Sequence, residues 1–163
     1  MHTSEFGFRV TPWEVEGVVD YDRLVEEFGV EKITAELLGE LKRIAGELHF
    51  LLRREFFFAH RDLELVVRDY AEGRGFFLYT GRAPSRAPMH LGHAIPLVLT
   101  KWLQEKFGAN TYIMIPDEEK YLAKKVDSLS EVDAYVEQDV LNVIALGFDP
   151  DKTFIFRDTE YIR

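Results

Sequence analysis

The 163-residue sequence contains no cysteine. This absence excludes disulfide bonds, thiolate nucleophiles and zinc or iron–sulfur sites held by cysteine. No apolar run reaches the roughly 18 residues that a membrane-spanning helix requires. The first residues, MHTSEFGFRVTPWEVEG, lack the basic flank and apolar core of a secretory signal. We therefore expect a cytoplasmic protein with no membrane segment.

Positive charge is also scarce. Lys and Arg total 20 against 29 Asp and Glu, which gives a net charge of −9. Because neutralisation of phosphates supplies most general affinity for nucleic acid, an acidic chain is a poor binder on its own. If RNA is a partner, most of the basic surface lies elsewhere. Uncharged amides are rare as well, and the excess of charge over Asn and Gln is typical of thermophilic proteins.

Three short apolar runs, at residues 76–80, 110–116 and 152–158, have the character of strands, and helical patterns separate them. Alternating strands and helices with right-handed crossovers predict an α/β fold with a Rossmann-like parallel sheet. The run FFLYT at 76–80 is unbroken, which is typical of a strand buried on both faces. A doubly wound sheet normally continues beyond a third strand, so the fold is expected to be incomplete at its C-terminus.

The connecting helices have recognisable ends. HLGHAIPLVLTKWLQEKFG predicts a long helix that stops at Gly108, with its first turns disturbed by Pro96. Ser128 and Glu131 form a capping box for a helix through Leu146, where Gly147 ends it.

The first part of the chain follows a different pattern. Residues 8–19 predict a hairpin or extended arm, followed by a short helix that ends near Gly29. Residues 33–55 have helical spacing with a break near Gly46. Residues 56–73 predict a further helix or a strongly turned approach to one, which Gly73 ends. We expect an N-terminal β arm and helical segment at 1–72, and the first half of a nucleotide-binding domain at 73–163.

His90 and His93 flank Gly92 where the predicted helix begins after a strand and a Pro-rich loop. Residues three apart share a helix face, so the pair could bind a metal or could be ordinary surface or core histidines. The context favours a phosphate site, because free N–H groups and the positive dipole end of a helix attract anions. Gly92 would let a nucleotide approach the backbone closely.

The motifs resemble one enzyme family. HLGH at 90–93 resembles the HIGH signature of class I aminoacyl-tRNA synthetases and related nucleotidyltransferases. LYTGRAPSRAPMHLGHAIPLVLTKWLQ at 78–104 is similar to tryptophanyl-tRNA synthetase of the archaeal and eukaryotic type. IPDEEKYL at 115–122 and GFDPDKTFIF at 147–156 resemble the family's next two blocks, and VTPWEVEG at 10–17 resembles its N-terminal segment.

The resemblance implies a tryptophan–tRNA ligase. In such an enzyme the tryptophan carboxylate attacks the α-phosphorus of Mg-ATP and releases pyrophosphate, and the amino acid then passes to tRNA(Trp). No protein nucleophile takes part, so catalysis depends on positioning and charge stabilisation. The catalytic residues it implies are His90, His93 and Lys120. The implied ATP contacts are Thr80, Gly81, Arg82, His90, Gly92, His93 and, from the N-terminal arm, Trp13. From the residues alone, Arg82 could instead form a surface salt bridge, and Trp13 could instead pack on the core.

For tryptophan, the resemblance implies contacts from Tyr79, Met114 and Glu119. Tyr79 could instead be a core tyrosine, and Glu119 could be solvated; Glu119 could also bind Mg²⁺. Known family members carry a glutamine where this sequence has Met114. Since a thioether is a polarisable but weak hydrogen-bond acceptor, Tyr79 becomes the main polar contact for the indole N–H, unless specificity rests more on shape or the alignment is shifted by one residue.

The family's KMSKS loop, the second half of the sheet and the anticodon-binding domain have no counterpart here. The chain is therefore expected to be an N-terminal fragment that meets tRNA(Trp) through missing parts, with weak ATP binding and little aminoacylation. The resemblance implies a homodimer for the full-length protein. Two alternatives remain: a tyrosyl-tRNA synthetase or small adenylyltransferase with the same histidines, and a non-catalytic nucleotide-binding or assembly module.

Overall fold

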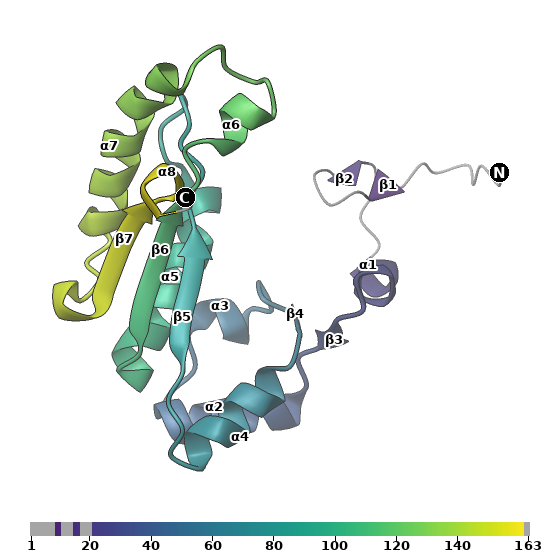
Figure 1. Ribbon diagram of the computed structural model, residues 1–163. Helices are drawn as coiled ribbons and strands as arrows, with labels where there is room; N and C mark the ends of the chain where they lie inside the picture. Colours follow the sequence, from purple (N-terminus) through teal and green to yellow (C-terminus); the bar gives the residue numbers. More distant parts are fainter. Residues whose placement is uncertain (1–8, 11–14, 17–20, 162–163) are drawn as a thin grey trace. The chain divides into compact units, whose positions relative to one another are not determined.

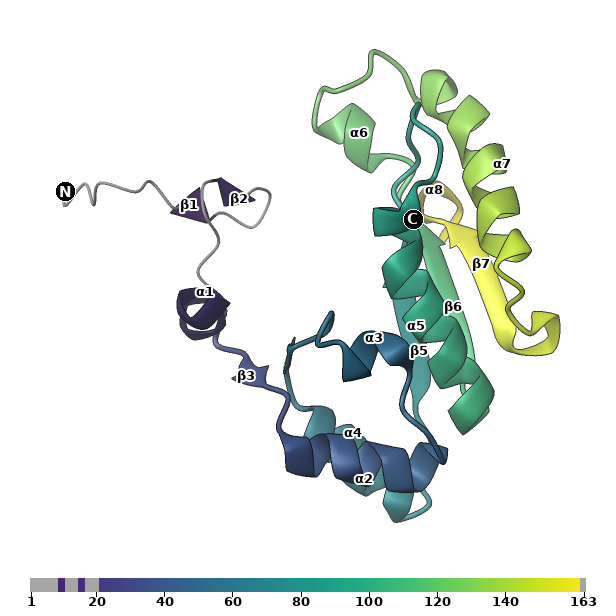
Figure 2. The ribbon, with the colours of Figure 1, turned by 180° about the vertical axis from the view of Figure 1, so that it is seen from behind.

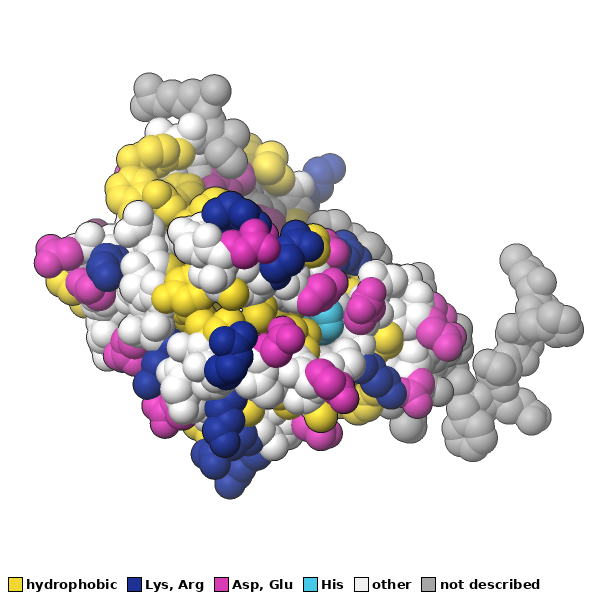
Figure 3. All heavy atoms as spheres, turned by 90° about the horizontal axis from the view of Figure 1, so that it is seen from below, with side chains coloured by type: hydrophobic (Ala, Val, Ile, Leu, Met, Phe, Trp, Pro, Cys, Tyr) yellow, Lys and Arg dark blue, Asp and Glu magenta, His cyan; other side chains and the backbone are white. Residues whose placement is uncertain are grey.

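The computed structural model describes residues 9–10, 15–16 and 21–161. The chain divides into two units, Met1–Arg68 and Asp69–Arg163, which are described separately. Trp13, expected to contact ATP, lies outside the described residues. No helix within the described ranges is long and apolar enough to span a membrane. On the face seen in Figure 3, acidic and basic side chains are interspersed with apolar ones.

The first unit consists of short strands and helices. The predicted hairpin is present, because β1 and β2 pair antiparallel. The predicted break near Gly46 is confirmed, since α2 ends there and the glycine has φ +83°. For residues 56–73 the structure has a turned approach to a helix and not one continuous helix, because residues 59–60 pair with β3 and a shorter helix follows. The elements are β1 (Arg9–Val10), β2 (Val15–Glu16), α1 (Tyr21–Phe28), β3 (Glu31–Lys32), α2 (Ala35–Ala45), α3 (Phe50–Arg53), β4 (Ala59–His60) and α4 (Leu63–Ala71), which crosses into the second unit.

The second unit contains the three predicted strands as a parallel sheet in the order β5-β6-β7. Figure 1 shows these strands side by side with their arrowheads at the same edge. The α/β prediction is thus confirmed for this unit. Its elements are β5 (Phe77–Gly81), α5 (Leu91–Phe107), β6 (Asn110–Ile115), α6 (Glu119–Leu122), α7 (Leu129–Ala145), the 3₁₀ helix η1 (Pro150–Lys152), β7 (Thr153–Arg157) and α8 (Asp158–Tyr161).

The boundaries of the two long helices agree with the sequence signals. Helix α5 follows His90 and ends at Gly108, whose φ of +62° suits a left-handed cap. Helix α7 begins after Ser128, whose hydroxyl accepts a hydrogen bond from the Glu131 amide at 3.3 Å. The Glu131 carboxylate, however, pairs with Arg86 at 2.8 Å. The capping box is therefore only half formed.

Both long helices cover the same face of the sheet. Leu97 of α5 and Val143 of α7 pack with Ile113 of β6 in one core cluster. Ile115 of β6 packs with Val136 of α7 in a second cluster. Figure 2 shows α5 in front of β5 and β6. This arrangement follows from right-handed crossovers that advance in one direction, since each places its helix on the same side.

The opposite face of the sheet is open in this unit, so the prediction that residues 76–80 are buried on both faces is wrong. Phe77 is 66% exposed and Tyr79 is 57% exposed. Tyr79 lies beside Tyr112, which lies beside Phe154, in register across the three strands. The open face is therefore aromatic, and it begins at the edge where the candidate site residues gather.

Candidate functional site

Most of the residues expected to bind substrates lie at or just beyond the carboxyl ends of the strands. Strand β5 ends at Gly81, β6 at Ile115 and β7 at Arg157. In open α/β sheets this edge is where ligands bind, because the loops there carry side chains and helix N-termini. The sheet is bound together at this edge by the amide of Arg82, which donates to the Met114 carbonyl at 2.9 Å.

His90 and His93 lie against one another at the start of α5. Their ring centroids are 3.8 Å apart with an interplanar angle of 26°. His90 is the N-cap residue, and its side chain makes no capping hydrogen bond. A Cβ on Gly92 would lie 3.1 Å from His90 Cε1. The glycine thus leaves room for the imidazole in this position.

The pKa of His93 lies below its ordinary value, chiefly because of burial and next because of the nearby positive charge of Arg82. Its Nδ1 atom is buried and has no hydrogen-bond partner among the described residues. Within the described ranges, no group of three His, Asp, Glu or Cys side chains could hold a metal ion.

Arg82 is buried rather than placed in a surface salt bridge. Its side chain is 6% exposed, and its Nη2 atom lies 3.2 Å from Asp139 Oδ1 on α7. The distance is that of an ion pair, although the geometry is not that of a hydrogen bond. Arg82 Nη1 donates to the Ala83 carbonyl, and Asp139 Oδ2 accepts from the Ser85 amide at 3.2 Å. This pair shapes the loop between β5 and the histidines.

Asp139 was not identified from the sequence, although a signal was present. Val132, Val136, Asp139 and Val143 share the buried stripe of α7 at helical spacing. A carboxylate in such a stripe needs a partner, because an unpaired buried charge is costly. The partner Arg82, however, is 57 positions away in the numbering, so the pairing itself could be found only in the folded chain.

Tyr79 and Met114 meet on the open face of the sheet. The Tyr79 hydroxyl lies 2.7 Å from Met114 Sδ and donates to it. Tyr79 is therefore not the core tyrosine that the residue alone could have been. Thr80 is half-buried and Gly81 is exposed at the end of the same strand, where a Cβ on Gly81 would lie 3.6 Å from Met114 Cε.

Glu119 and Lys120 form the first turn of α6. Glu119 is exposed, and Lys120 is half-buried. Lys120 lines an open pocket of about 550 Å³ together with two other cations, Arg86 and Lys125. The remaining lining residues are Ser85, Ala87, Val126, Glu131 and Tyr135. A larger pocket of about 640 Å³ lies in the first unit, and none of the residues that line it is a predicted site residue.

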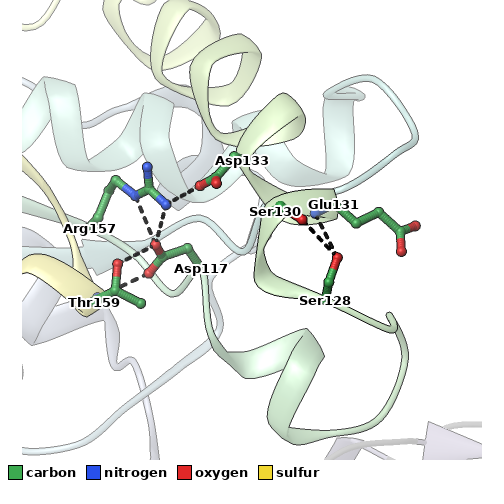
Figure 4. A network of polar contacts seen from close by, with 7 residues as sticks. All are labelled: Asp117, Ser128, Ser130, Glu131, Asp133, Arg157 and Thr159. Atoms are coloured by element: carbon green, nitrogen blue, oxygen red, sulfur yellow. Dashed lines mark hydrogen bonds and ion pairs between the residues drawn. The ribbon is translucent and has the colours of Figure 1, made fainter.

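A polar network next to α6 was also missed by sequence reasoning. Asp117 is 1% exposed and lies at its centre, bonded to Arg157 and Thr159 (Figure 4). Beside it, burial and the nearby carboxylates of Asp158 and Asp117 raise the pKa of Glu118 above its ordinary value. The sequence DEEK thus contains one anchored carboxylate, one whose pKa is raised and one that is exposed.

Comparison with known proteins identifies the family. Residues 71–163 match the family described as tRNA synthetases class I (W and Y). The tryptophan–tRNA ligase of Saccharolobus solfataricus is 58% identical over 156 residues, which cover 96% of this chain and 41% of that protein. The corresponding protein of Pyrococcus horikoshii is 54% identical over 157 residues, with 96% and 40% covered. The chain thus spans about two fifths of the length of these curated relatives.

Solved structures agree with the sequence matches. A tryptophanyl-tRNA synthetase from Trypanosoma brucei matches with a TM-score of 0.82 at 43% identity, over 88% of this chain and 44% of that one. One from Encephalitozoon cuniculi, bound to tryptophan, matches with a TM-score of 0.83 at 40% identity, over 88% and 40%. The HLGH motif, the order of the sheet and these similarities together show that the chain belongs to the class I tRNA synthetases for tryptophan and tyrosine, in the tryptophan–tRNA ligase branch of the archaeal and eukaryotic type.

Proposed function

We propose that this chain forms the walls of a site that binds tryptophan and ATP for the activation of tryptophan on its way to tRNA(Trp). The observation that carries the proposal is the meeting of two half-sites at one edge of the sheet. The stacked His90–His93 pair lies at the N-terminus of α5, and Tyr79 and Met114 lie at the ends of β5 and β6. Arg82 connects them through its bond to the Met114 carbonyl.

The chemistry needs no protein nucleophile. A carboxylate oxygen of tryptophan attacks the α-phosphorus of ATP, the bond to the bridging oxygen breaks, and pyrophosphate leaves with the electron pair. A ribose hydroxyl of tRNA then attacks the carbonyl carbon of the adenylate, and AMP leaves. His93, whose lowered pKa favours the neutral form, can donate one N–H to a phosphate oxygen. His90, Lys120 and the first amides of α5 would add further donors to the phosphates, beside Thr80, Gly81 and Gly92. Arg82, whose buried side chain pairs with Asp139, would hold the loop that connects these groups.

Tyr79 is proposed to select the indole ring. Its hydroxyl proton is directed to the Met114 sulfur, so the phenolic oxygen keeps lone pairs that can accept the indole N–H. Met114 adds a polarisable surface against an aromatic ring. Because a ligand without the N–H would leave this oxygen without its bond, the site would prefer tryptophan. Glu119 is proposed to meet the substrate ammonium.

Mg²⁺ is proposed to arrive with ATP rather than to occupy a site built by the protein. The described residues gather no set of three metal ligands, and Glu119 is a single exposed carboxylate. Magnesium in nucleotide sites is typically held by the phosphates, waters and one or two carboxylates. We also propose that residues 73–163 form the first half of a nucleotide-binding domain. Homodimer formation and a cytoplasmic location are proposed as well.

Titration calorimetry with tryptophan tests the substrate assignment. The full 163-residue chain should bind tryptophan more tightly than benzothienylalanine, which lacks the N–H. Tyr79→Phe should weaken tryptophan binding about 5-fold, equivalent to roughly 1 kcal/mol, and should remove this preference. Tyr21→Phe is the matched control, because Tyr21 is similarly exposed at 58% but belongs to the first unit.

Tighter binding of tyrosine than of tryptophan would favour the tyrosyl alternative and reject this proposal. ATP binding is also measured by titration calorimetry. The variant His93→Ala should bind ATP more weakly than the parent chain. We expect weak ATP binding and little tryptophan-dependent exchange of pyrophosphate into ATP. If the chain binds tryptophan and ATP but exchanges no pyrophosphate into ATP, its function is binding and not catalysis.

A further inference from the structure

Asp117 lies two residues beyond the end of β6, where four hydrogen bonds and ion pairs hold its carboxylate. Its carboxylate accepts from Arg157 Nε at 2.8 Å and lies 2.7 Å from Arg157 Nη2. It also accepts from the Thr159 amide at 3.1 Å and from the Thr159 hydroxyl at 2.6 Å. All these donors come from the end of β7 and from α8 (Figure 4). A loop that follows β6 is thereby fastened to the neighbouring strand.

Arg157 extends this fastening to a third element. Its Nη2 atom also pairs with Asp133, which lies in the first half of α7. Arg157 therefore lies between a buried carboxylate and an exposed one, as Figure 4 shows. Although burial alone would raise the pKa of Asp117, the hydrogen bonds from Thr159 and Arg157 outweigh it and lower this pKa. The lowered pKa favours the charged carboxylate, and both of its oxygens accept hydrogen bonds.

Helix α6 begins only two residues after Asp117, and its own packing gives it little support. It has one turn, Glu119–Leu122, and none of its four side chains, all within the described part of the chain, is buried. Leu122 is 70% exposed. Since an isolated turn of helix is unstable in water, its position must come from the residues that hold its ends. The fastened residue nearest to its N-terminus is Asp117.

We propose that Asp117, Arg157 and Thr159 are positioning residues that place α6, and through it Glu119 and Lys120, at the edge of the substrate site. What Glu119 and Lys120 bind rests on the proposed function, whereas the control of α6 by Asp117 does not. The three residues touch no expected substrate atom and act through the helix. Loss of the network should therefore loosen α6 first and weaken substrate binding as a consequence.

Hydrogen exchange followed by mass spectrometry on the ligand-free, full chain tests the positional role directly. The amides of Leu122, Ala123 and Lys125 are protected by hydrogen bonds to the carbonyls of residues 118–120. In Thr159→Val, which removes the 2.6 Å bond, these amides should exchange at least about 10-fold faster, because local opening becomes easier. Amides of β6, residues 111–115, should exchange as before. Thr159→Ser should restore protection.

Two further variants sharpen the test. Asp117→Asn should loosen α6 more than Thr159→Val does, because the amide replaces the charge that Arg157 needs. Asp133→Asn should have a smaller effect, since Asp133 is 52% exposed and does not contact Asp117. Unchanged exchange in α6, or equal acceleration in α6 and β6, would show that the network serves general stability only and would overturn the proposal.

A double-mutant cycle then connects the network to binding. If the network acts through α6, Thr159→Val should weaken tryptophan binding several-fold in the parent chain. The same substitution should have almost no further effect on tryptophan binding in the Glu119→Gln variant. Equal effects in both backgrounds would contradict action through Glu119. If the parent chain binds no tryptophan, the proposed function fails, while the hydrogen-exchange result still decides whether Asp117 positions α6.

Discussion

Arg82 and Asp139 form a buried ion pair across the second unit, with 3.2 Å between Arg82 Nη2 and Asp139 Oδ1. Asp139 also accepts from the Ser85 amide, so it holds both the arginine and the backbone of the loop that leads to His90. Removing one partner would leave the other charge buried and unpaired. Asp139→Ala should therefore destabilise the chain by about 3 kcal/mol or more, measured by urea unfolding.

The exposed pair of Arg74 and Asp69 serves as the control for this prediction. Its atoms lie 2.7 Å apart, but both side chains are well exposed. Asp69→Ala should lower the free energy of unfolding by less than about 1 kcal/mol, because water screens such pairs. Equal losses for the two variants would mean that the burial of Asp139 does not decide its importance.

Gly92→Ala should weaken ATP binding without lowering the stability of the chain. The new Cβ would lie 3.1 Å from His90 Cε1 and 3.2 Å from His90 Nδ1, so the imidazole must move. The backbone itself accepts alanine, and alanine in a helix is favoured over glycine by up to about 1 kcal/mol. We expect unchanged or higher thermal stability together with weaker ATP binding by calorimetry. Unimpaired binding would show that the stacked geometry of the histidines is not needed.

His93 should make stability depend on pH. Because its pKa in the folded chain lies below the ordinary 6.5, the unfolded chain binds more protons near that pH. The free energy of unfolding should therefore fall as the pH is lowered from about 7.5 to about 5.5. His93→Gln should reduce this slope, and the difference between the two urea-unfolding series isolates the histidine. Parallel slopes would contradict the prediction.

Gln104 should be one of the most sensitive polar residues of the core. It is 2% exposed, and its amide group contacts Thr111 Oγ1 at 3.0 Å, Thr153 Oγ1 at 2.8 Å and the Asp149 amide at 2.9 Å. Gln104→Leu should lower the free energy of unfolding by about 2 to 4 kcal/mol, because these groups lose their partner without access to water. Gln138→Leu, on the exposed side of α7, should change it by less than about 0.5 kcal/mol. Thermal or urea unfolding measures both.

The order and type of the three strands and two long helices in the second unit followed from the sequence alone, whereas the short α6, η1 and α8 were not predicted. The apolar runs at 76–80, 110–116 and 152–158 became the strands, and Gly108 ended the helix between the first two. The capping signal at Ser128 located the start of α7. These features depend on residues a few positions apart, so local periodicity and caps contain the information. The motif at 90–93 likewise marked the start of a helix and, by resemblance, the family.

Only the tertiary structure decided which side chains meet and which stay exposed. The pattern at 76–80 predicted burial on both faces, but the crossovers place α5 and α7 on the same side and leave Tyr79 open. The partners of Arg82 and Asp117 come from residues 57 and about 40 positions further along the chain. Periodicity along one segment can show that a charged residue will be buried, but it cannot name a partner on another element. Packing of the sheet against its helices settles that choice, since it brings the strand ends and helix starts to a common edge.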